Sequence, residues 1–313
     1  MLIMTRHLHL LPAVLFVLII PFAFTAAAQT RKYKDLVFEK VRIQKNLVYN
    51  DNPAAGVKSR YYQFDFYEPD ADSSIVRPLI IWLHGGGFKF GKKTSGGLPL
   101  WSKTFARRGY TCATINYRLS NKHPLKHFED LVEGCADAVE DASIAIQFFK
   151  QHSGVYRIDT NRIIIAGNSA GGMIALQSVY SSRADMAKLI HRGDTGQPSA
   201  YNPHHIAAVI NFWGALFKAD WLTNASVPIV SAHGSGDRVV PCGDKKPPLI
   251  GSCAIQLLAD SLHIPNNLKI FEGYGHELQK HFNPLFAGHA AKKRWLTAGQ
   301  FAADFLYTRL FQQ

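Results

Sequence analysis

Residues 163–176 have the sequence IIIAGNSAGGMIAL, and this stretch decides how the chain is organised. A short β-branched apolar run bounded by glycine predicts a buried strand, and the residues after Gly172 predict a helix. A nucleophile elbow, the G-x-S-x-G turn that exposes a reactive serine, requires this order of strand, tight turn and helix. Gly167 and Gly171 flank Ser169 where a Cβ would crowd the turn. The same pattern also fits an ordinary strand-to-helix turn, so its interpretation depends on the rest of the chain.

Other apolar runs predict further strands around this turn. Residues 62–67 alternate with a period of two and end at Pro69, as an edge or near-edge strand does. Residues 79–83 are continuously apolar, which is typical of a central strand covered on both faces. The remaining predicted strands lie at 36–43, 110–117, 206–212, 228–232 and 268–271, and the predicted helices include 130–150 and 295–311. This alternation predicts a mostly parallel sheet of about eight strands with helices on both faces.

The length and composition favour a globular α/β protein. The chain has 313 residues, of which 47% are hydrophobic, so it can bury a full core. We expect one domain over residues 29–313, with a small polar insertion around residues 181–203. The net charge is +12, but the basic residues are scattered and form no recognition-helix or stacking pattern. This distribution argues against nucleic-acid binding and favours a basic surface.

The first 28 residues have the pattern of a secretory signal peptide. Arg6 supplies a positive charge, residues 10–20 are apolar, and the alanines at 26–28 are small enough to precede a cleavage site. The pattern predicts a secreted or periplasmic protein that begins at Gln29 and is not stably inserted in a membrane. An uncleaved anchor is the alternative, because the apolar character continues to residue 24.

The four cysteines fit an oxidising compartment. Cys242 and Cys253 flank a short loop rich in glycine and proline, and we expect a disulfide between them. Cys112 lies in a strand-like run and Cys135 in a helix-like run. These two either form a second bridge or are small buried apolar residues.

The sequence His84-Gly85-Gly86-Gly87 follows the central predicted strand directly. Consecutive glycines leave backbone N–H groups unblocked, so that the chain can approach a ligand closely. Such donors stabilise the tetrahedral oxyanion of ester and amide cleavage. A flexible turn or a phosphate-binding loop is the alternative, but the chain completes neither the P-loop nor the G-x-G-x-x-G pattern.

Together, HGGGF at 84–88 and GNSAGG at 167–172 resemble the motifs of the α/β-hydrolase esterases, especially the hormone-sensitive-lipase-like and carboxylesterase branches. The resemblance runs from about Tyr62 to the C-terminus and implies the α/β-hydrolase fold. The chain departs from the pattern at Asn168, where the hormone-sensitive-lipase branch usually has an acidic residue. It also lacks a long helical cap between residues 29 and 62.

The resemblance also implies roles for particular residues. The oxyanion donors would be the N–H groups of Gly86, Gly87 and Ala170, and Ser169 would be the nucleophile. The activity implied is that of a serine esterase that cleaves carboxylic esters through an acyl-enzyme. Its substrate would be a small or polymer-linked ester, with an acyl group that is short, carbohydrate-linked, aromatic or part of a polyester.

A catalytic triad in this fold has the chain order Ser, Asp or Glu, His. His276 lies in a glycine-rich turn just after the predicted strand 268–271, which favours it as the base. Asp237 lies in a loop after the predicted strand 228–232 and is the expected acid, in a position similar to the family's acid loop. Asp244 and Asp220 are the alternative acids.

Four apolar residues just beyond strand ends are candidates for substrate contacts, because ligands bind there in open α/β sheets. They are Phe88, Tyr117, Trp213 and Leu216. Large apolar residues are equally common as core filler. The chain has no H-E-x-x-H motif and no cysteine–histidine cluster, so we expect neither a metal nor another cofactor.

Two other kinds of function remain compatible with the sequence. The same triad could serve an exported peptidase or an acyltransferase, since the fold does not determine the acceptor. A non-catalytic binding or adhesion module is the alternative outside enzymes. Such modules typically lose the serine or the histidine, whereas this chain has both, together with Asp237.

Overall fold

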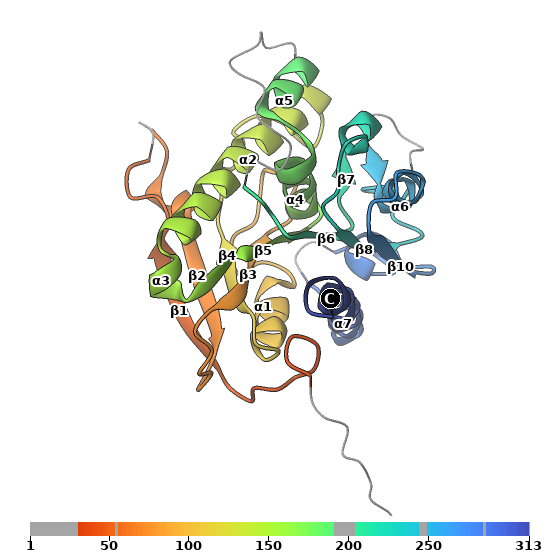
Figure 1. The fold of residues 1–313 in the computed structure, drawn as a ribbon. Coiled ribbons are helices and arrows are strands. Elements are labelled where there is room, and N and C mark those ends of the chain that lie inside the picture. Colours follow the sequence, from red (N-terminus) through yellow and green to blue (C-terminus); the bar gives the residue numbers. More distant parts are fainter. Residues whose placement is uncertain (1–30, 54–55, 191–203, 244–248, 284–285, 313) are drawn as a thin grey trace, which may run out of the picture.

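The computed structural model describes residues 31–53, 56–190, 204–243, 249–283 and 286–312 (Figure 1). Its main strands are β1 Val41–Val48, β2 Gln63–Pro69, β3 Arg77–Leu83, β4 Thr111–Ile115, β5 Ile158–Asn168, β6 Ala208–Phe212, β8 Ile229–Gly234 and β10 Asn266–Phe271. They form one sheet in the order β1-β2-β4-β3-β5-β6-β8-β10. All pairs from β4 to β10 are parallel, and β2 runs antiparallel to both β1 and β4. The predicted α/β-hydrolase fold with about eight strands is confirmed.

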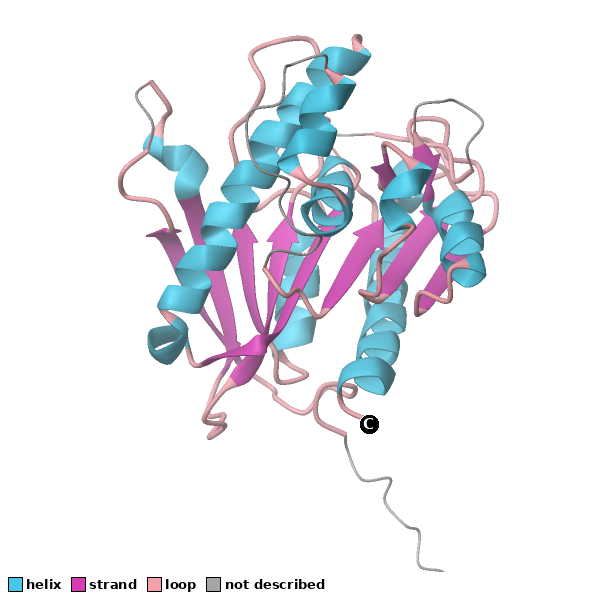
Figure 2. Ribbon diagram, turned by 45° about the horizontal axis from the view of Figure 1, so that its top comes forward, coloured by secondary structure: helices cyan, strands magenta, loops and turns pink. Residues whose placement is uncertain are grey.

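Helices cover both faces of this sheet, as Figure 2 shows. The helices are α1 Leu98–Ala106, α2 Phe128–Gln151, α3 Ser153–Tyr156, α4 Ala170–Tyr180, α5 Arg183–Leu189, α6 Ser252–Ser261 and α7 His289–Leu310. Buried side chains of α2, α4 and α6 belong to the core on one face, and those of α1 and α7 belong to the core on the other. In the part of the chain described, no helix combines the length and apolar character needed to span a membrane.

The central strands alternate between these two cores. In β3, Leu79, Ile81 and Leu83 face the core under α2 and α4, while Ile80 and Trp82 face the core under α1 and α7. All five side chains are fully buried. Successive residues of a strand point to opposite faces, so a strand covered on both sides must be apolar throughout. This requirement explains why the continuous apolar runs of the sequence identified the middle of the sheet.

The structure corrects several of the predicted boundaries. The first strand is β1, five residues later than the predicted start at Leu36, because Leu36 and Val37 are exposed and Val37 and Phe38 bond to a carbonyl of the α1–β4 loop instead. Within the predicted insertion, Ser182 and Asp185 form a capping box that begins α5. Residues 191–203 of that insertion, and the predicted signal peptide, lie outside the described residues.

The cysteines behave differently from one another. Cys242 and Cys253 form a disulfide, as predicted. Cys112 and Cys135 are free and buried. They lie in the cores on opposite faces of the sheet, so the alternative of a bridge between them is wrong. Burial raises the pKa of both thiols above the usual range, as expected for inert core cysteines.

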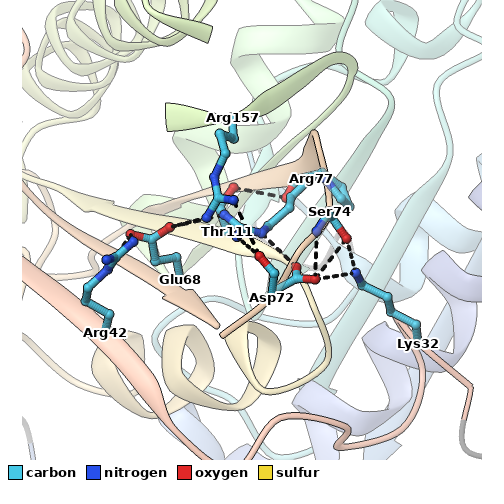
Figure 3. A network of polar contacts seen from close by, with 9 residues as sticks. Lys32, Arg42, Glu68, Asp72, Ser74, Arg77, Thr111 and Arg157 are labelled. Atoms are coloured by element: carbon cyan, nitrogen blue, oxygen red, sulfur yellow. Dashed lines mark hydrogen bonds and ion pairs between the residues drawn. The ribbon is translucent and has the colours of Figure 1, made fainter. Parts of the chain in front are cut away.

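A buried ionic cluster lies around Arg77, the first residue of β3, at the end of that strand opposite to the glycine loop (Figure 3). The Arg77 guanidinium is fully buried and contacts Asp72 at 2.8 Å and Glu68 at 3.1 Å. Lys32 bonds Asp72 as well, which ties the start of the described chain to the sheet. Burial alone would raise the pKa of Asp72, but hydrogen bonds from Arg77, Lys32 and Ser74 lower it to about 2.

Replacing Arg77 by methionine leaves two buried carboxylates without their main partner. Breaking a buried ion pair on one side typically costs about 3–5 kcal/mol. We therefore expect Arg77→Met to lower the free energy of unfolding by about that amount in a denaturant titration. The matched control is Arg42→Met, because Arg42 also bonds Glu68 but its side chain is 59% exposed. The control should cost less than about 1 kcal/mol, and equal losses in the two variants would contradict this account.

Candidate active site

The turn between β5 and α4 holds Ser169 in a strained conformation. Ser169 has φ 54° and ψ −122°, which few residues with a side chain adopt. The turn is possible because the residues that flank it are glycines, which have no Cβ and can therefore pack directly against the neighbouring backbone. A Cβ on Gly167 would lie 2.2 Å from the carbonyl carbon of Gly171, and one on Gly171 would lie 2.0 Å from the carbonyl oxygen of Leu83. The elbow therefore requires both glycines and seats the start of α4 on the end of β3.

The three residues predicted for a triad form one hydrogen-bonded chain. His276 Nε2 lies 2.8 Å from Ser169 Oγ, and His276 Nδ1 lies 2.7 Å from Asp237 Oδ2. A carboxylate can only accept, so the neutral ring carries its proton on Nδ1. Nε2 is then the acceptor that faces the serine hydroxyl. Each of the three residues is less than 9% exposed.

The loop after β8 holds the carboxylate of Asp237 through its second oxygen, Oδ1. The backbone N–H groups of Val239 and Val240 donate to Asp237 Oδ1 at 2.9 and 3.0 Å, which leaves Oδ2 for His276. Burial alone would raise the pKa of Asp237. Hydrogen bonds from His233 and His276 outweigh that effect and hold the pKa of this carboxyl well below its usual range. The group is therefore a carboxylate at neutral and mildly acidic pH.

A second histidine, His233, supports Asp237 and was not singled out by the sequence reasoning. Its Nε2 lies 2.8 Å from the carbonyl oxygen of Val240 and 3.4 Å from Asp237 Oδ2. Because both neighbours are acceptors, Nε2 carries the proton and the other nitrogen accepts from the Ser252 hydroxyl at 2.7 Å. Ser252 begins α6 and precedes Cys253, so the disulfide lies directly behind the acid loop. The signal in the sequence is a histidine at the end of a buried strand, four residues before the acid.

The glycine loop after β3 brings the backbone N–H groups of Gly86 and Gly87 to the same end of the sheet. Gly86 and Gly87 have φ of +116° and +59°, and a Cβ on Gly86 would meet the carbonyl of Phe90 at 2.3 Å. Ala170 is the first residue of α4, where backbone N–H groups have no partner within the helix. Among the described residues, none of these three N–H groups donates to a protein acceptor. The elbow contact between Gly171 and Leu83 keeps the two groups of donors adjacent.

His84 and Tyr117 hold the glycine loop in place. Their rings stack with centroids 4.1 Å apart, and the Tyr117 hydroxyl donates to the His84 carbonyl at 2.7 Å. Burial lowers the pKa of His84 to about 4, so its ring is neutral at neutral pH. His84 and Tyr117 are therefore a neutral platform under the glycines.

All four residues predicted to contact substrate are fully buried. Tyr117 supports the loop as described, and Phe88 packs beneath it against α2 at Gly134. Trp213 packs among the aromatic residues of the α1 and α7 face, and Leu216 lies in the two-residue strand β7 Ala215–Leu216. Full burial places them in the interior, because a residue must offer surface to touch a ligand. The position beyond a strand end did not distinguish these two roles.

The other residues considered in the sequence have clear positions. Asn168 is buried beside Gly85, and its Oδ1 has no partner among the described residues. Asp220, an alternative acid, is exposed, and Asp244 lies outside the described residues. Within the described ranges, no group of three histidine, cysteine, aspartate or glutamate residues is arranged to hold a metal ion.

Two known proteins with similar sequences are esterases by name. "Gut esterase 1" of Caenorhabditis elegans is 31% identical over 104 residues, which are 33% of this chain and 18% of that protein. "Esterase LipI" of Mycobacterium tuberculosis is 30% identical over 138 residues, 43% of this chain and 37% of that protein. The chain thus spans less than two fifths of the length of these curated relatives.

Solved structures agree on the fold. Esterase 2 of Thermogutta terrifontis, in a form described as phosphorylated by paraoxon, matches with a TM-score of 0.59 and 23% identity, over 87% of this chain and 95% of that one. The model of the BD-FAE family matches residues 64–220, just over half of the 313 residues, and includes both the glycine loop and the elbow. The predicted resemblance to α/β-hydrolase esterases is confirmed, and the chain belongs to the BD-FAE family.

Proposed function

We propose that this protein is a serine hydrolase that cleaves carboxylic esters through Ser169, His276 and Asp237. The observation that carries the proposal is the continuous hydrogen-bonded chain from Ser169 Oγ through both nitrogens of His276 to Asp237. The N–H groups of Gly86, Gly87 and Ala170, which have no acceptor within the described ranges, and the esterase names of the relatives support the same conclusion.

The acylation step follows from the protonation of His276. Nε2 takes the hydroxyl proton of Ser169 as its oxygen attacks the ester carbonyl, and the ring becomes a cation stabilised by Asp237. The negative charge that develops on the carbonyl oxygen is accepted by the N–H groups of Gly86, Gly87 and Ala170. The alcohol then leaves with the proton that His276 returns.

Deacylation repeats these steps with water as the nucleophile. His276 removes a proton from water, the oxyanion forms at the same N–H groups, and the acid leaves while Ser169 recovers its proton. The groups that act in this cycle are already held in place: the glycine loop by His84 and Tyr117, and the accepting carboxylate of Asp237 by two backbone N–H groups. Such preorganisation is usually the largest single contribution to rate acceleration of this kind.

We also propose that the protein acts outside the cytoplasm. The support is the signal-peptide pattern of residues 1–28 and the disulfide between Cys242 and Cys253, since structural disulfides persist mainly in oxidising compartments.

The nucleophile is tested by Ser169→Ala. We expect hydrolysis of p-nitrophenyl acetate by the purified protein to fall by about 10⁶ in kcat, the loss found where a serine nucleophile is removed. The fold should persist because alanine adds no atom to the turn. Ser178→Ala is the matched control, since Ser178 lies on the same helix and its hydroxyl has no partner among the described residues. If Ser169→Ala retains activity within tenfold of the wild type, Ser169 is not the nucleophile.

The acid is tested by Asp237→Asn. The N–H groups of Val239 and Val240 would hold the amide oxygen where Oδ1 is now, and the NH₂ group would then face His276. His276 would have to accept there and carry its proton toward Ser169, where it cannot act as the base. We expect kcat to fall by up to about 10⁴, as in serine proteases with this exchange. The exposed Asp220→Asn variant should keep full activity. If Asp220→Asn loses activity and Asp237→Asn keeps it, the acid is Asp220 instead.

The pH profile gives a separate readout on the same enzyme. Because the pKa of Asp237 is held below its usual range, this carboxylate stays charged and its stabilising effect disappears only in strong acid. The acid limb of kcat/KM should therefore have the slope of a single proton, because Asp237 adds no second ionisation to it. A limb with the slope of two protons would contradict a carboxylate that stays charged.

A further inference from the structure

Phe282 packs against the candidate base and still offers apolar surface to solvent. Its ring lies edge-on to the imidazole of His276, with the ring centroids 5.1 Å apart and the planes at 85°. Within the described ranges, no other aromatic ring packs against His276. Phe282 is 42% exposed, whereas His276 is only 3% exposed. The phenyl ring therefore covers part of the imidazole and presents the rest of its surface outward.

A buried amide holds the segment that carries Phe282. Gln279 Nε2 donates to the carbonyl of Asn283 at 3.3 Å, and Gln279 Oε1 accepts from the backbone N–H of Asn283 at 3.2 Å. The carbonyl of Gln279 accepts in turn from the N–H of Gly275 at 2.7 Å, directly before His276. Gln279 is 7% exposed. The turn that presents Phe282 is thus closed at both ends and tied to the turn of the base.

The proposed mechanism brings the alcohol part of the ester to His276. Nε2, which lies 2.8 Å from Ser169 Oγ, returns its proton to the oxygen of the leaving alcohol. That oxygen must come within hydrogen-bond reach of Nε2. The oxyanion binds at the N–H groups of the glycine loop and the elbow instead, and the acid part makes no bond to the imidazole. The first carbons of the alcohol therefore lie beside the ring of His276.

An aromatic ring next to these carbons favours particular alcohols. Aromatic rings attract one another in edge-on or offset arrangements, beyond the gain from removing apolar surface from water. The aromatic residues Phe88, Tyr117 and Trp213 are fully buried and have no surface left for such a contact. Phe282 has that surface, and its contact with His276 places it next to the atom that protonates the leaving group.

We infer that Phe282 determines specificity for the alcohol part of the ester, and that the preferred alcohols carry an aromatic ring close to the ester oxygen, as in benzyl esters. The inference rests on the proposed ester hydrolysis and adds to it the class of ester. Phe282 takes no part in proton transfer. Its contribution is apolar contact with the alcohol, so its removal should affect KM for aromatic alcohols rather than kcat for all esters.

Three esters separate the alcohol side of the scissile bond from the acid side. Benzyl acetate and methyl phenylacetate are isomers with the phenyl ring on the alcohol part and on the acid part, respectively, and methyl acetate has no ring. Benzyl alcohol and methanol are leaving groups of similar basicity, so a difference between the two acetates reports contacts of the ring. With acid release followed in a pH-stat, we expect the wild type to have a kcat/KM about tenfold higher for benzyl acetate than for methyl acetate, mainly through KM.

Substitutions then assign this preference to Phe282. Phe282→Ala should lower kcat/KM for benzyl acetate by about tenfold and leave methyl acetate and methyl phenylacetate within about twofold of the wild type. Phe282→Tyr retains the ring and should retain the preference. Neither exchange should unfold the protein, because the residue is 42% exposed. Phe286→Ala is the matched control, a phenylalanine of the same segment that is 69% exposed, and it should change none of the three esters.

The outcomes separate this inference from the proposed function. If the wild type does not prefer benzyl acetate, or if Phe282→Ala keeps the preference, the role of Phe282 is refuted and the esterase stands. A loss confined to methyl phenylacetate would place the ring at the acid part, and an equal loss with all three esters would show that it acts only on His276. Both results overturn the inference. If the wild type cleaves neither these esters nor p-nitrophenyl acetate, the proposed function itself is refuted.

Discussion

The site depends on the contact between Gly171 and the carbonyl oxygen of Leu83, where no Cβ fits. This contact places the start of α4 directly on the end of β3. Ser169 is thereby forced into its strained turn, and the N–H of Ala170 is brought beside the glycine loop that follows Leu83. One close approach of two backbones therefore aligns the nucleophile with the groups that would receive the oxyanion.

The acid and the base come from β8 and β10, two strands in the other half of the same sheet. β8 and β10 are parallel neighbours, so the loops after them, which contain Asp237 and His276, emerge side by side. His233, Ser252 and the disulfide behind Asp237 hold the first of these loops. The opposite end of β3 is anchored by the buried Arg77 cluster. The candidate catalytic groups thus gather at the carboxyl ends of the strands, while the Arg77 cluster stabilises the opposite end of β3.

Much of this arrangement could be predicted because it follows from local pattern. Strands covered on both faces must be apolar at every position, which identified β3 and β5, and the elbow requires glycines at fixed offsets from Ser169. The chain order of a triad pointed to Asp237 and His276. Contacts that depend on tertiary packing could not be predicted from the sequence. The role of His233 is visible only in the structure, where this residue at the end of β8 lies 3.4 Å from Asp237. The burial of Phe88, Tyr117, Trp213 and Leu216 was equally hidden, since core and pocket residues share the same composition.

The central claim is that His276 and Asp237 make Ser169 a nucleophile, and covalent labelling tests it directly. A fluorophosphonate reacts with an activated serine, which displaces fluoride and retains the phosphonyl group. The account predicts one phosphonyl group per chain, located by mass spectrometry of a digest on the peptide that contains Ser169, and its loss in His276→Ala. Labelling of another serine instead, or equally fast labelling of Ser169 without His276, would contradict the account.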